Sequence, residues 1–447
     1  MLRPLFVGTL VLLAACAPQK PPLPAPPVAE TRDYEVAAPH GATRNDEYYW
    51  LRDDTRENAE MLAYLAAENT YADAVLAPLA ERQQALYDEL IGRLKQDDAS
   101  VPSRYKDYWY YTRYETGSEY PIHARRKGSM DAPEEILLDV TALAGDSAYY
   151  NIGNWEVSPD QRLLAYFEDS VGRRQYTLRV KDLTTGELLP TEISGLSPSV
   201  AWVGNDKLFY TQNDPDTLLT KRIFMHYVDG SKPDVPVYEE ADDSFYIGVG
   251  ATRSEEYACV FMQSTMSSRQ MCTETANPGH FRWTTPNDPD VEYEADHLGD
   301  RWVIRTNWDA KNFKLMEVSE QNLANRDQWT DLLPHDDGVF VSEFELFDGF
   351  MAVGERANGL TRIRVLDGDG ADFIAADEPA YSMALSANPD PASDWVRYTY
   401  TSLTTPTTWY ERRPNRTVFV SIPGSAPNRR RQYPSLISTT AAGPPPR

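Results

Sequence analysis

The strongest constraint on the fold is a recurrence of short apolar and aromatic segments about every 45–50 residues. These segments begin at Tyr108, Leu163, Lys207, Glu256, Arg301, Phe350 and Asp394, at intervals of 55, 44, 49, 45, 49 and 44 residues. Each alternates with a period of two, as a half-buried strand does. A repeat of this length predicts propeller blades, whereas a β-sandwich requires more evenly spaced strands. We therefore expect an all-β fold, a seven-bladed β-propeller over residues 101–411 with an incomplete last blade.

A helical pattern precedes the repeats. Asp54-Thr55-Arg56-Glu57 has the spacing of a capping box, with a Glu three residues after an acidic N-cap. Apolar residues then recur at helical spacing, first at Met61, Leu62, Leu65 and Ala66 and later at Leu86, Leu90, Ile91 and Leu94. The pattern stops at Pro102. We expect an N-terminal helical arm over residues 36–100.

The first sixteen residues have the form of an export signal. Arg3 precedes an apolar stretch that is too short to span a bilayer, and Leu13-Ala14-Ala15-Cys16 resembles the lipobox of bacterial lipoproteins. This predicts a signal peptide over residues 1–16 and lipidation of Cys16; the alternative is a plain secretory signal. Residues 17–35 are rich in Pro and predict an extended linker. We expect an exported, lipid-anchored envelope protein at the periplasmic face, on the outer membrane.

The charge balance limits the classes of partner. The chain carries 43 Lys and Arg against 68 Asp and Glu, a formal net charge of −25. Nucleic-acid binding depends on basic residues that neutralise phosphates, so no nucleic-acid partner is expected. The 27 Tyr and 10 Trp suit a β-rich architecture, because aromatic side chains favour a pleated surface.

Cys259 and Cys272 flank an expected hairpin turn near residues 263–268. Antiparallel pairing about that turn places the two cysteines opposite each other, which allows a disulfide in an oxidising compartment. The alternative is a pair of small buried side chains without a bond. We keep both alternatives open at this point.

The residues reveal no catalytic or metal-binding motif. A Gly-x-Ser-x-Gly nucleophile motif does not occur, and the six His lack the spacing of a zinc site, so neither a metal nor a cofactor is expected. His297 is expected to be a locally hydrogen-bonded packing residue. Residues 367–372 are better explained by a hairpin turn than by a calcium loop. The acidic pairs Asp242-Asp243 and Asp336-Asp337 are expected to be solvated loop charges.

Several stretches resemble the non-catalytic part of oligopeptidase B, in the prolyl oligopeptidase family of serine peptidases. They are His40 to Asp53, Leu62 to Asn69, Asp107 to Arg113, Asp296 to Asn307, Pro334 to Asp337, Gly359 to Arg362 and Thr401 to Thr408. They occur in order over about residues 36–411. The resemblance implies a seven-bladed propeller that, in the family, precedes an α/β-hydrolase domain and limits access to short peptides. Oligopeptidase B cleaves after Lys or Arg.

The resemblance assigns no catalytic residue to this chain, because no position matches the family's Ser, Asp or His motifs. We therefore expect the substrate-gating propeller of an oligopeptidase B-like peptidase that is inactive alone. Its expected partners are short basic peptides, its own missing hydrolase domain in the full-length form, and a membrane through the lipid anchor. The alternative is an envelope lipoprotein propeller that acts as a binding or scaffold module; a third, weaker alternative is a propeller glycosidase.

Residues 412–447 differ from the rest in composition. They contain seven Arg, seven Pro and no Asp or Glu, and the resemblance stops at Glu411. We favour a frameshift after about Glu411, because the resemblance ends within a repeat. A natural disordered basic tail is the alternative.

The lipidation prediction is tested by the substitution Cys16→Ser. We expect this change to abolish incorporation of labelled palmitate and to release the protein from the membrane fraction, because the thiol is the acylation site. Cys259→Ser is the matched control and should leave labelling unchanged. Equal labelling of Cys16→Ser and the parent chain would contradict the prediction.

Overall fold

A computed structural model describes residues 23–323, 325–368, 370–414 and 419–422. The chain divides into two compact units, one up to Leu94 and the other from Lys95 onward. The predicted signal peptide, Cys16 and most of residues 412–447 lie outside the described residues. Within the described ranges, no helix has both the length and the apolar character that a membrane span requires.

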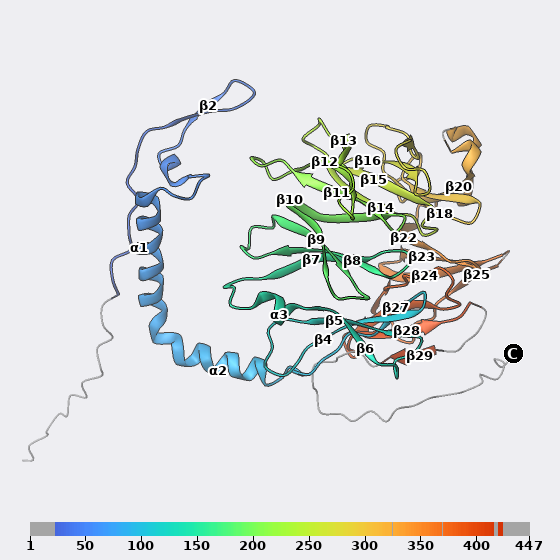
Figure 1. Ribbon diagram of the computed structural model, residues 1–447, viewed down its shortest axis with the longest axis horizontal. Helices are drawn as coiled ribbons and strands as arrows, with labels where there is room; N and C mark the ends of the chain where they lie inside the picture. Colours follow the sequence, from blue (N-terminus) through green and yellow to red (C-terminus); the bar gives the residue numbers. More distant parts are fainter. Residues whose placement is uncertain (1–22, 324, 369, 415–418, 423–447) are drawn as a thin grey trace, which may run out of the picture. The chain divides into compact units, whose positions relative to one another are not determined.

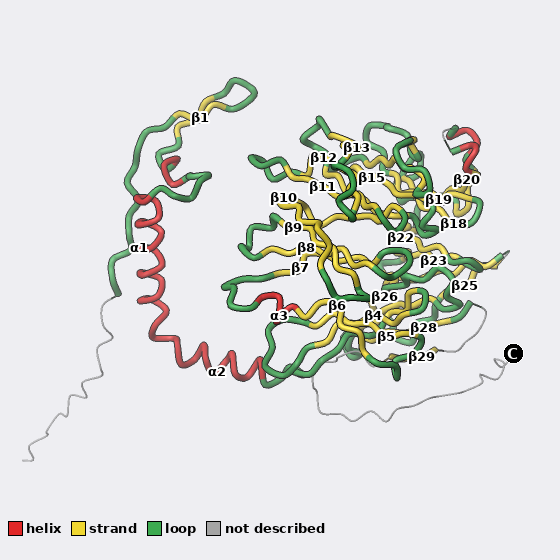
Figure 2. Tube along the Cα trace, in the orientation of Figure 1, coloured by secondary structure: helices red, strands yellow, loops and turns green. Residues whose placement is uncertain are grey.

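The first unit contains the helical arm. Its elements are the antiparallel pair β1 (Glu35–Ala37) and β2 (Thr43–Asn45), the short 3₁₀ helices η1 (Tyr49–Leu51) and η2 (Ala77–Leu79), and the helices α1 (Ala59–Leu76) and α2 (Ala80–Ile91) (Figure 2). The helices expected within the arm, residues 36–100, are thus present.

The predicted capping box is wrong. The N-cap of α1 is Asn58, whose side-chain oxygen accepts hydrogen bonds from the backbone N–H groups of Glu60 and Met61, each at 3.0 Å. The carboxylate of Asp53 accepts from the backbone N–H groups of residues 55, 57 and 58. These bonds hold residues 53–58 as a loop, so the helix begins one turn later than the sequence spacing suggests.

The second unit is built almost entirely from antiparallel strands (Figure 1). Its first sheet contains β3 (Ser103–Tyr105), β4 (Tyr108–Arg113), β5 (Ile122–Lys127) and β6 (Glu134–Asp139), and the short helix α3 (Val140–Ala144) follows. A seven-stranded sheet contains β7 (Asn151–Val157), β8 (Leu163–Asp169), β9 (Tyr176–Asp182), β10 (Leu188–Val203), β11 (Lys207–Asn213), β12 (Thr220–Tyr227) and β13 (Val235–Glu239).

Four more four-stranded sheets complete the unit. They contain β14 (Tyr246–Ala251), β15 (Tyr257–Gln263), β16 (Ser268–Glu274) and β17 (Arg282–Trp283); β18 (Tyr293–Leu298), β19 (Arg301–Thr306), β20 (Lys314–Ser319) and β21 (Thr330–Leu333); β22 (Val339–Leu346), β23 (Met351–Ala357), β24 (Leu360–Asp367) and β25 (Gly370–Phe373); and β26 (Tyr381–Leu385), β27 (Val396–Ser402), β28 (Thr408–Arg412) and β29 (Phe419–Ile422). The 3₁₀ helices η3 (Glu320–Asn322) and η4 (Arg326–Gln328) lie between β20 and β21.

The prediction of a seven-bladed propeller is wrong, because the structure has five separate four-stranded blades. All seven expected strands are present, as β4, β8, β11, β15, β19, β23 and β27. However, two of them lie in one continuous sheet, since the 16-residue strand β10 pairs with both β9 and β11. Register shifts within β10, and Gly195 at φ +77°, let this long strand bend without ending.

The prediction of an incomplete last blade is also wrong. The strand β29 pairs with β28 in an antiparallel ladder from Trp409 with Ile422 to Arg412 with Phe419. The fourth strand therefore comes from the segment beyond Glu411, where the family resemblance had ended.

Apolar clusters join sheets that follow one another in the chain. Leu138 of the first sheet packs with Tyr166 of β8, and Ile223 of β12 packs with Val260 of β15. Further clusters join each later sheet to the next, up to a cluster that contains Ile363 and Val396. Burial of these side chains supplies the main stabilisation of the unit.

The seam between the last sheet and the first is polar. Among the described residues, no apolar cluster contains side chains of both sheets. Arg397 of β27 joins them instead: its Nη1 donates to the carbonyl oxygen of Pro102 at 2.7 Å and to Oγ of Ser103 at 3.2 Å. Its Nε donates to Glu411 at 2.9 Å, so the buried guanidinium is also paired with a carboxylate.

The substitution Arg397→Met tests this closure. We expect it to lower the free energy of unfolding by about 3 kcal/mol, because it leaves the half-buried Glu411 without its cation and removes the bonds across the seam. The measurement is urea unfolding. The control, Arg222→Met, breaks an exposed ion pair with Glu239 and should change the same quantity by less than about 0.5 kcal/mol. Equal effects of the two substitutions would contradict a closing role for Arg397.

Candidate functional site

Four carboxylates from β18 and β22 form the candidate site, and we call them the channel carboxylates. They are Glu294 and Asp296 on β18 and Glu343 and Glu345 on β22. Side chains two residues apart on a strand share one face, so each strand presents two of them together. Both strands are the first of their sheets, and the sheets of a propeller surround a central channel.

Burial weakens the acidity of these groups. It raises the pKa of Asp296 to about 6 and that of Glu345 to about 7. Burial also raises the pKa of Glu343. The pKa of Glu294 is raised by partial burial and by repulsion from Glu343, although its side chain remains 54% exposed. One oxygen of Glu345, Oε2, is buried without a hydrogen-bond partner among the described residues.

Two guanidinium groups lie among the channel carboxylates. Nη1 of Arg305 is 3.6 Å from Glu294, and its Nε donates to the carbonyl oxygen of Val341 at 2.9 Å. The backbone N–H of Arg253 donates to Oδ1 of Asp296 at 2.9 Å. Two cations face four carboxylates, so the local charge is negative once all four ionise.

The turn between β14 and β15, residues 252–256, connects sheets that are distant in the chain. Arg253 donates to the carbonyl oxygen of Leu346, the last residue of β22, at 3.2 Å and to that of Asn388, which follows β26, at 2.6 Å. Glu255 accepts from Nζ of Lys106 at 2.7 Å and from the hydroxyl of Tyr105 in the first sheet. We call this segment the crossing turn, because its bonds reach four other sheets, the β18 sheet included.

A Ser–His contact in the crossing turn has a structural explanation. Oγ of Ser254 lies 2.9 Å from Nδ1 of His297, which resembles a nucleophile next to a base. However, His297 is 1% exposed and packs against the rings of Tyr257 and Trp302. Burial lowers the pKa of His297. The expectation of a packing His is therefore confirmed, but its side chain bonds to a residue 43 positions away rather than to a local one.

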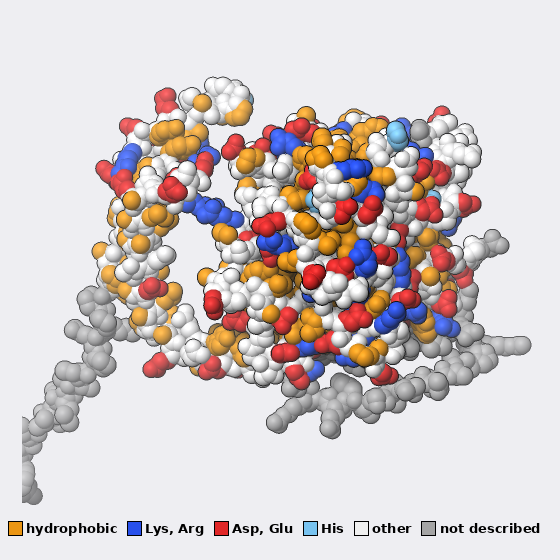
Figure 3. All heavy atoms as spheres, viewed as in Figure 1, with side chains coloured by type: hydrophobic (Ala, Val, Ile, Leu, Met, Phe, Trp, Pro, Cys, Tyr) orange, Lys and Arg blue, Asp and Glu red, His pale blue; other side chains and the backbone are white. Residues whose placement is uncertain are grey.

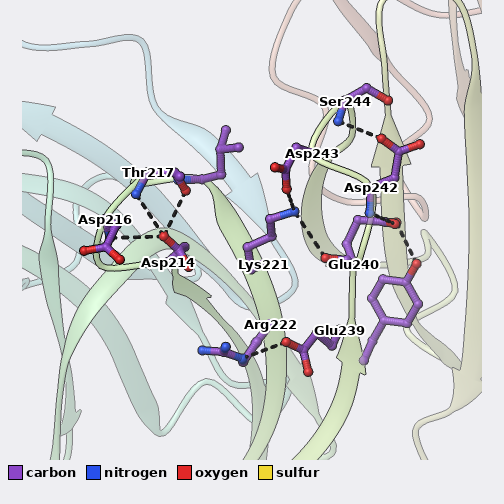
Figure 4. A network of polar contacts seen from close by, with 12 residues as sticks. Asp214, Asp216, Thr217, Lys221, Arg222, Glu239, Glu240, Asp242, Asp243 and Ser244 are labelled. Atoms are coloured by element: carbon purple, nitrogen blue, oxygen red, sulfur yellow. Dashed lines mark hydrogen bonds and ion pairs between the residues drawn. The ribbon is translucent and has the colours of Figure 1, made fainter. Parts of the chain in front are cut away.

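The acidic pairs that the sequence singled out serve as turn caps and ion-pair partners. Asp242 accepts from the backbone N–H of Ser244 at 2.9 Å, and Asp243 pairs with Lys221, as Figure 4 shows. Asp336 likewise accepts from the N–H of Gly338, at 2.7 Å, and Asp337 pairs with Lys311. On the face seen in Figure 3, acidic and basic side chains are interspersed over the strand-rich unit.

The two cysteines lie opposite each other on neighbouring strands. Cys259 of β15 is in register with Cys272 of β16, and the structure joins them in a disulfide with Cα atoms 4.0 Å apart. Both side chains are fully buried in an apolar cluster. The bond ties two strands of one blade together and leaves the channel carboxylates untouched.

Sequence reasoning missed the channel carboxylates because it searched for adjacent acidic residues. Adjacent residues on a strand point to opposite faces, whereas carboxylates two residues apart point to the same face. The signal was present in Tyr293-Glu294-Ala295-Asp296, where buried and acidic residues alternate. The sequence could not show, however, that these residues share a site with those of β22, because only the fold brings β18 and β22 together.

The substitution Glu345→Gln tests the burial of this carboxylate. The folded-state pKa is raised, so the folded protein holds this proton more tightly than the unfolded chain does, and stability falls as pH rises from about 4.5 to about 7. We expect Glu345→Gln to raise the free energy of unfolding by about 1–3 kcal/mol more at pH 8 than at pH 4, measured by urea unfolding. For the exposed control Glu239→Gln, the change in the free energy of unfolding should be the same at both pH values. The same result for both substitutions would contradict the burial of the Glu345 carboxylate.

Comparison with known proteins assigns the chain to a family. The chain is 51% identical to dipeptidyl aminopeptidase BI of Pseudoxanthomonas mexicana over 429 residues, which covers 90% of this chain and 59% of that protein. It is 29% identical to Protease 2 of Moraxella lacunata over 381 residues, covering 83% of this chain and 54% of that protein. Oligopeptidase B from Leishmania major superposes with a TM-score of 0.83 at 25% identity, covering 90% of this chain and 61% of that structure.

The chain thus spans less than two thirds of the length of these relatives. The model of the prolyl oligopeptidase N-terminal beta-propeller domain matches residues 27–417. This match covers most of the chain and extends six residues past the point where the resemblance in the sequence had stopped. The chain belongs to the prolyl oligopeptidase family, of which it carries the N-terminal β-propeller domain.

Proposed function

We propose that this chain is the substrate-admitting propeller of a peptidase that acts on short peptides next to Lys or Arg. The observation that carries this proposal is that, in the described part of the chain, the four channel carboxylates lie near two guanidinium groups, those of Arg305 and Arg253. A channel lined by one sign of charge attracts peptides of the opposite sign and raises their local concentration.

The crossing turn supports a role in size selection. Its bonds from Arg253 and Glu255 connect the β14 sheet to four other sheets. We infer from these bonds that the turn crosses the space that the sheets enclose. Such a crossing admits flexible, narrow chains and excludes folded domains. A filter of this kind agrees with the names of two relatives, dipeptidyl aminopeptidase and oligopeptidase B, which describe enzymes that act on peptides.

The catalytic groups belong to a further domain in this proposal. We propose that an α/β-hydrolase domain supplies the nucleophile, the base and the orienting acid. The propeller then contributes selection of substrates, and the channel carboxylates contribute to association rate more than to the chemical step.

A chimaera tests the gating role. Residues 27–417 of this chain are joined to the part of dipeptidyl aminopeptidase BI that lies beyond the aligned region. We expect the chimaera to cleave short Arg-containing reporters and to leave the same sequence intact when it lies in a loop of a folded protein, because the crossing turn excludes folded domains. The readout is the ratio of kcat/KM for the two substrates. Cleavage of the folded substrate as fast as the reporter would refute the filter, and cleavage of the reporter by this chain alone would refute the assignment of catalysis to another domain.

In the same chimaera, the double substitution Glu294→Gln and Glu343→Gln tests the role of charge. We expect kcat/KM to fall several-fold for basic reporters, with a smaller fall for neutral ones and at high salt, because screening weakens the attraction. The double substitution Glu187→Gln and Glu239→Gln removes the same charge from an exposed turn and from the outer strand β13. This charge-matched control should leave kcat/KM unchanged for both basic and neutral reporters. An equal fall for basic and neutral reporters would show that the carboxylates act through structure rather than charge.

A further inference from the structure

A cavity of about 430 Å³ lies where the first sheet meets β7. This volume falls within the range of about 300–1,000 Å³ typical of small-ligand sites. Aromatic rings form much of its wall: Tyr105 from β3, Tyr110 from β4 and Trp155 from β7. The ring centre of Tyr110 is 6.4 Å from that of Tyr105 and 6.1 Å from that of Trp155, so the three rings are continuous.

The carboxyl group of Glu156 shares this cavity. No hydrogen-bond donor or cation in the described part of the chain contacts its side chain, although its backbone carbonyl accepts from Trp202. Burial alone raises the pKa of Glu156 to about 8. A buried carboxyl group without a partner is unfavourable when ionised, and a cation brought into the cavity would relieve this.

The neighbouring charged groups are engaged elsewhere. Lys106, next to Tyr105, bonds to Glu255 and to the carbonyl oxygen of Pro159. Arg125, which donates to the hydroxyl of Tyr110 at 3.5 Å, bonds to Glu135 and to the carbonyl oxygen of Gln161. Of the described residues that line the cavity, none is Lys, Arg or His.

One histidine lies behind the wall of the cavity. The ring of His123, on β5, is 5.6 Å from that of Trp155, and its Nδ1 is 3.1 Å from the hydroxyl of Thr112. Burial lowers the pKa of His123, so at pH 7 it carries no charge that would compete for Glu156. Glu156 is therefore the carboxyl group that an incoming cation would meet, and it can ionise beside that cation.

We propose that this cavity binds the guanidinium group of an arginine side chain, with the charge on Glu156 and the planar face against Tyr110 and Trp155. A guanidinium group matches a carboxylate with two parallel hydrogen bonds and stacks on aromatic rings, which a compact ammonium group does less well. That the arginine belongs to a peptide rests on the proposed function. The cavity is separate from the channel carboxylates, so it would hold a second basic residue of the peptide.

Calorimetry with two isosteric ligands tests the proposal on this chain alone. Nα-acetyl-arginine amide carries the guanidinium, and Nα-acetyl-citrulline amide replaces it with a neutral urea. We expect saturable binding of the arginine derivative at pH 7 and binding at least about tenfold weaker for the citrulline derivative. No saturable binding, or equal affinity for the two ligands, would overturn the proposal.

Proton release provides a second readout. Glu156 is mostly protonated in the empty cavity at pH 7 and becomes ionised beside the cation, so binding should release close to one proton. The binding enthalpy should then vary with the ionisation enthalpy of the buffer. Binding without such dependence would show that the arginine derivative lies elsewhere.

Matched variants locate the site. Glu156→Gln should abolish both binding and proton release, whereas Glu187→Gln, on an exposed turn, should leave both unchanged. Tyr110→Phe keeps the ring and should retain binding, while Tyr110→Leu should weaken it several-fold. Unaltered binding by Glu156→Gln would overturn the proposal. Failure of the chimaera to cleave peptides would contradict the proposed function but would not affect these binding measurements. The proposed function and the arginine-binding cavity can therefore be refuted independently.

Discussion

Closure of the ring is the constraint on which the rest of this propeller depends. No strand is shared between the first and last sheets, because β3 to β6 and β26 to β29 are each continuous in the chain. Apolar clusters join the sheets in succession but leave this seam to Arg397, Glu411 and the backbone around Pro102. A buried ion pair is strongly directional, so it fixes the position of the seam more than it adds net stability.

The closed ring holds charges that an open sheet would leave in water. The channel carboxylates lie on strands from two sheets, and their raised pKa values arise from burial that exists only once the sheets pack together. The crossing turn adds to this burial. Burying these carboxylates costs free energy, and the apolar clusters between the sheets offset that cost. The scaffold thus supplies the stability that holds the site in place.

Local patterns in the sequence predicted individual strands well and their association less well. The recurrence found the second strand of each repeat, because alternation of apolar and polar residues is a local consequence of the pleat. The blade count failed at β10, where register shifts and Gly195 let one strand run on between two repeats. The helix start also failed, since Asp53 takes the amide of Glu57 that the expected capping box would have used, and Asn58 caps the helix instead.

The sequence by itself determined the β-rich repeat, the preceding helices, the acidic net charge and the family to which the chain is similar, because each follows from the spacing or identity of residues along the chain. The tertiary structure alone decided which sheets are separate, how the ring closes and which acidic residues meet. Glu294 and Glu345 are 51 positions apart, and Glu156 meets Tyr105 and Tyr110 across a sheet boundary. Such contacts depend on the packing of whole sheets, and no local pattern encodes them.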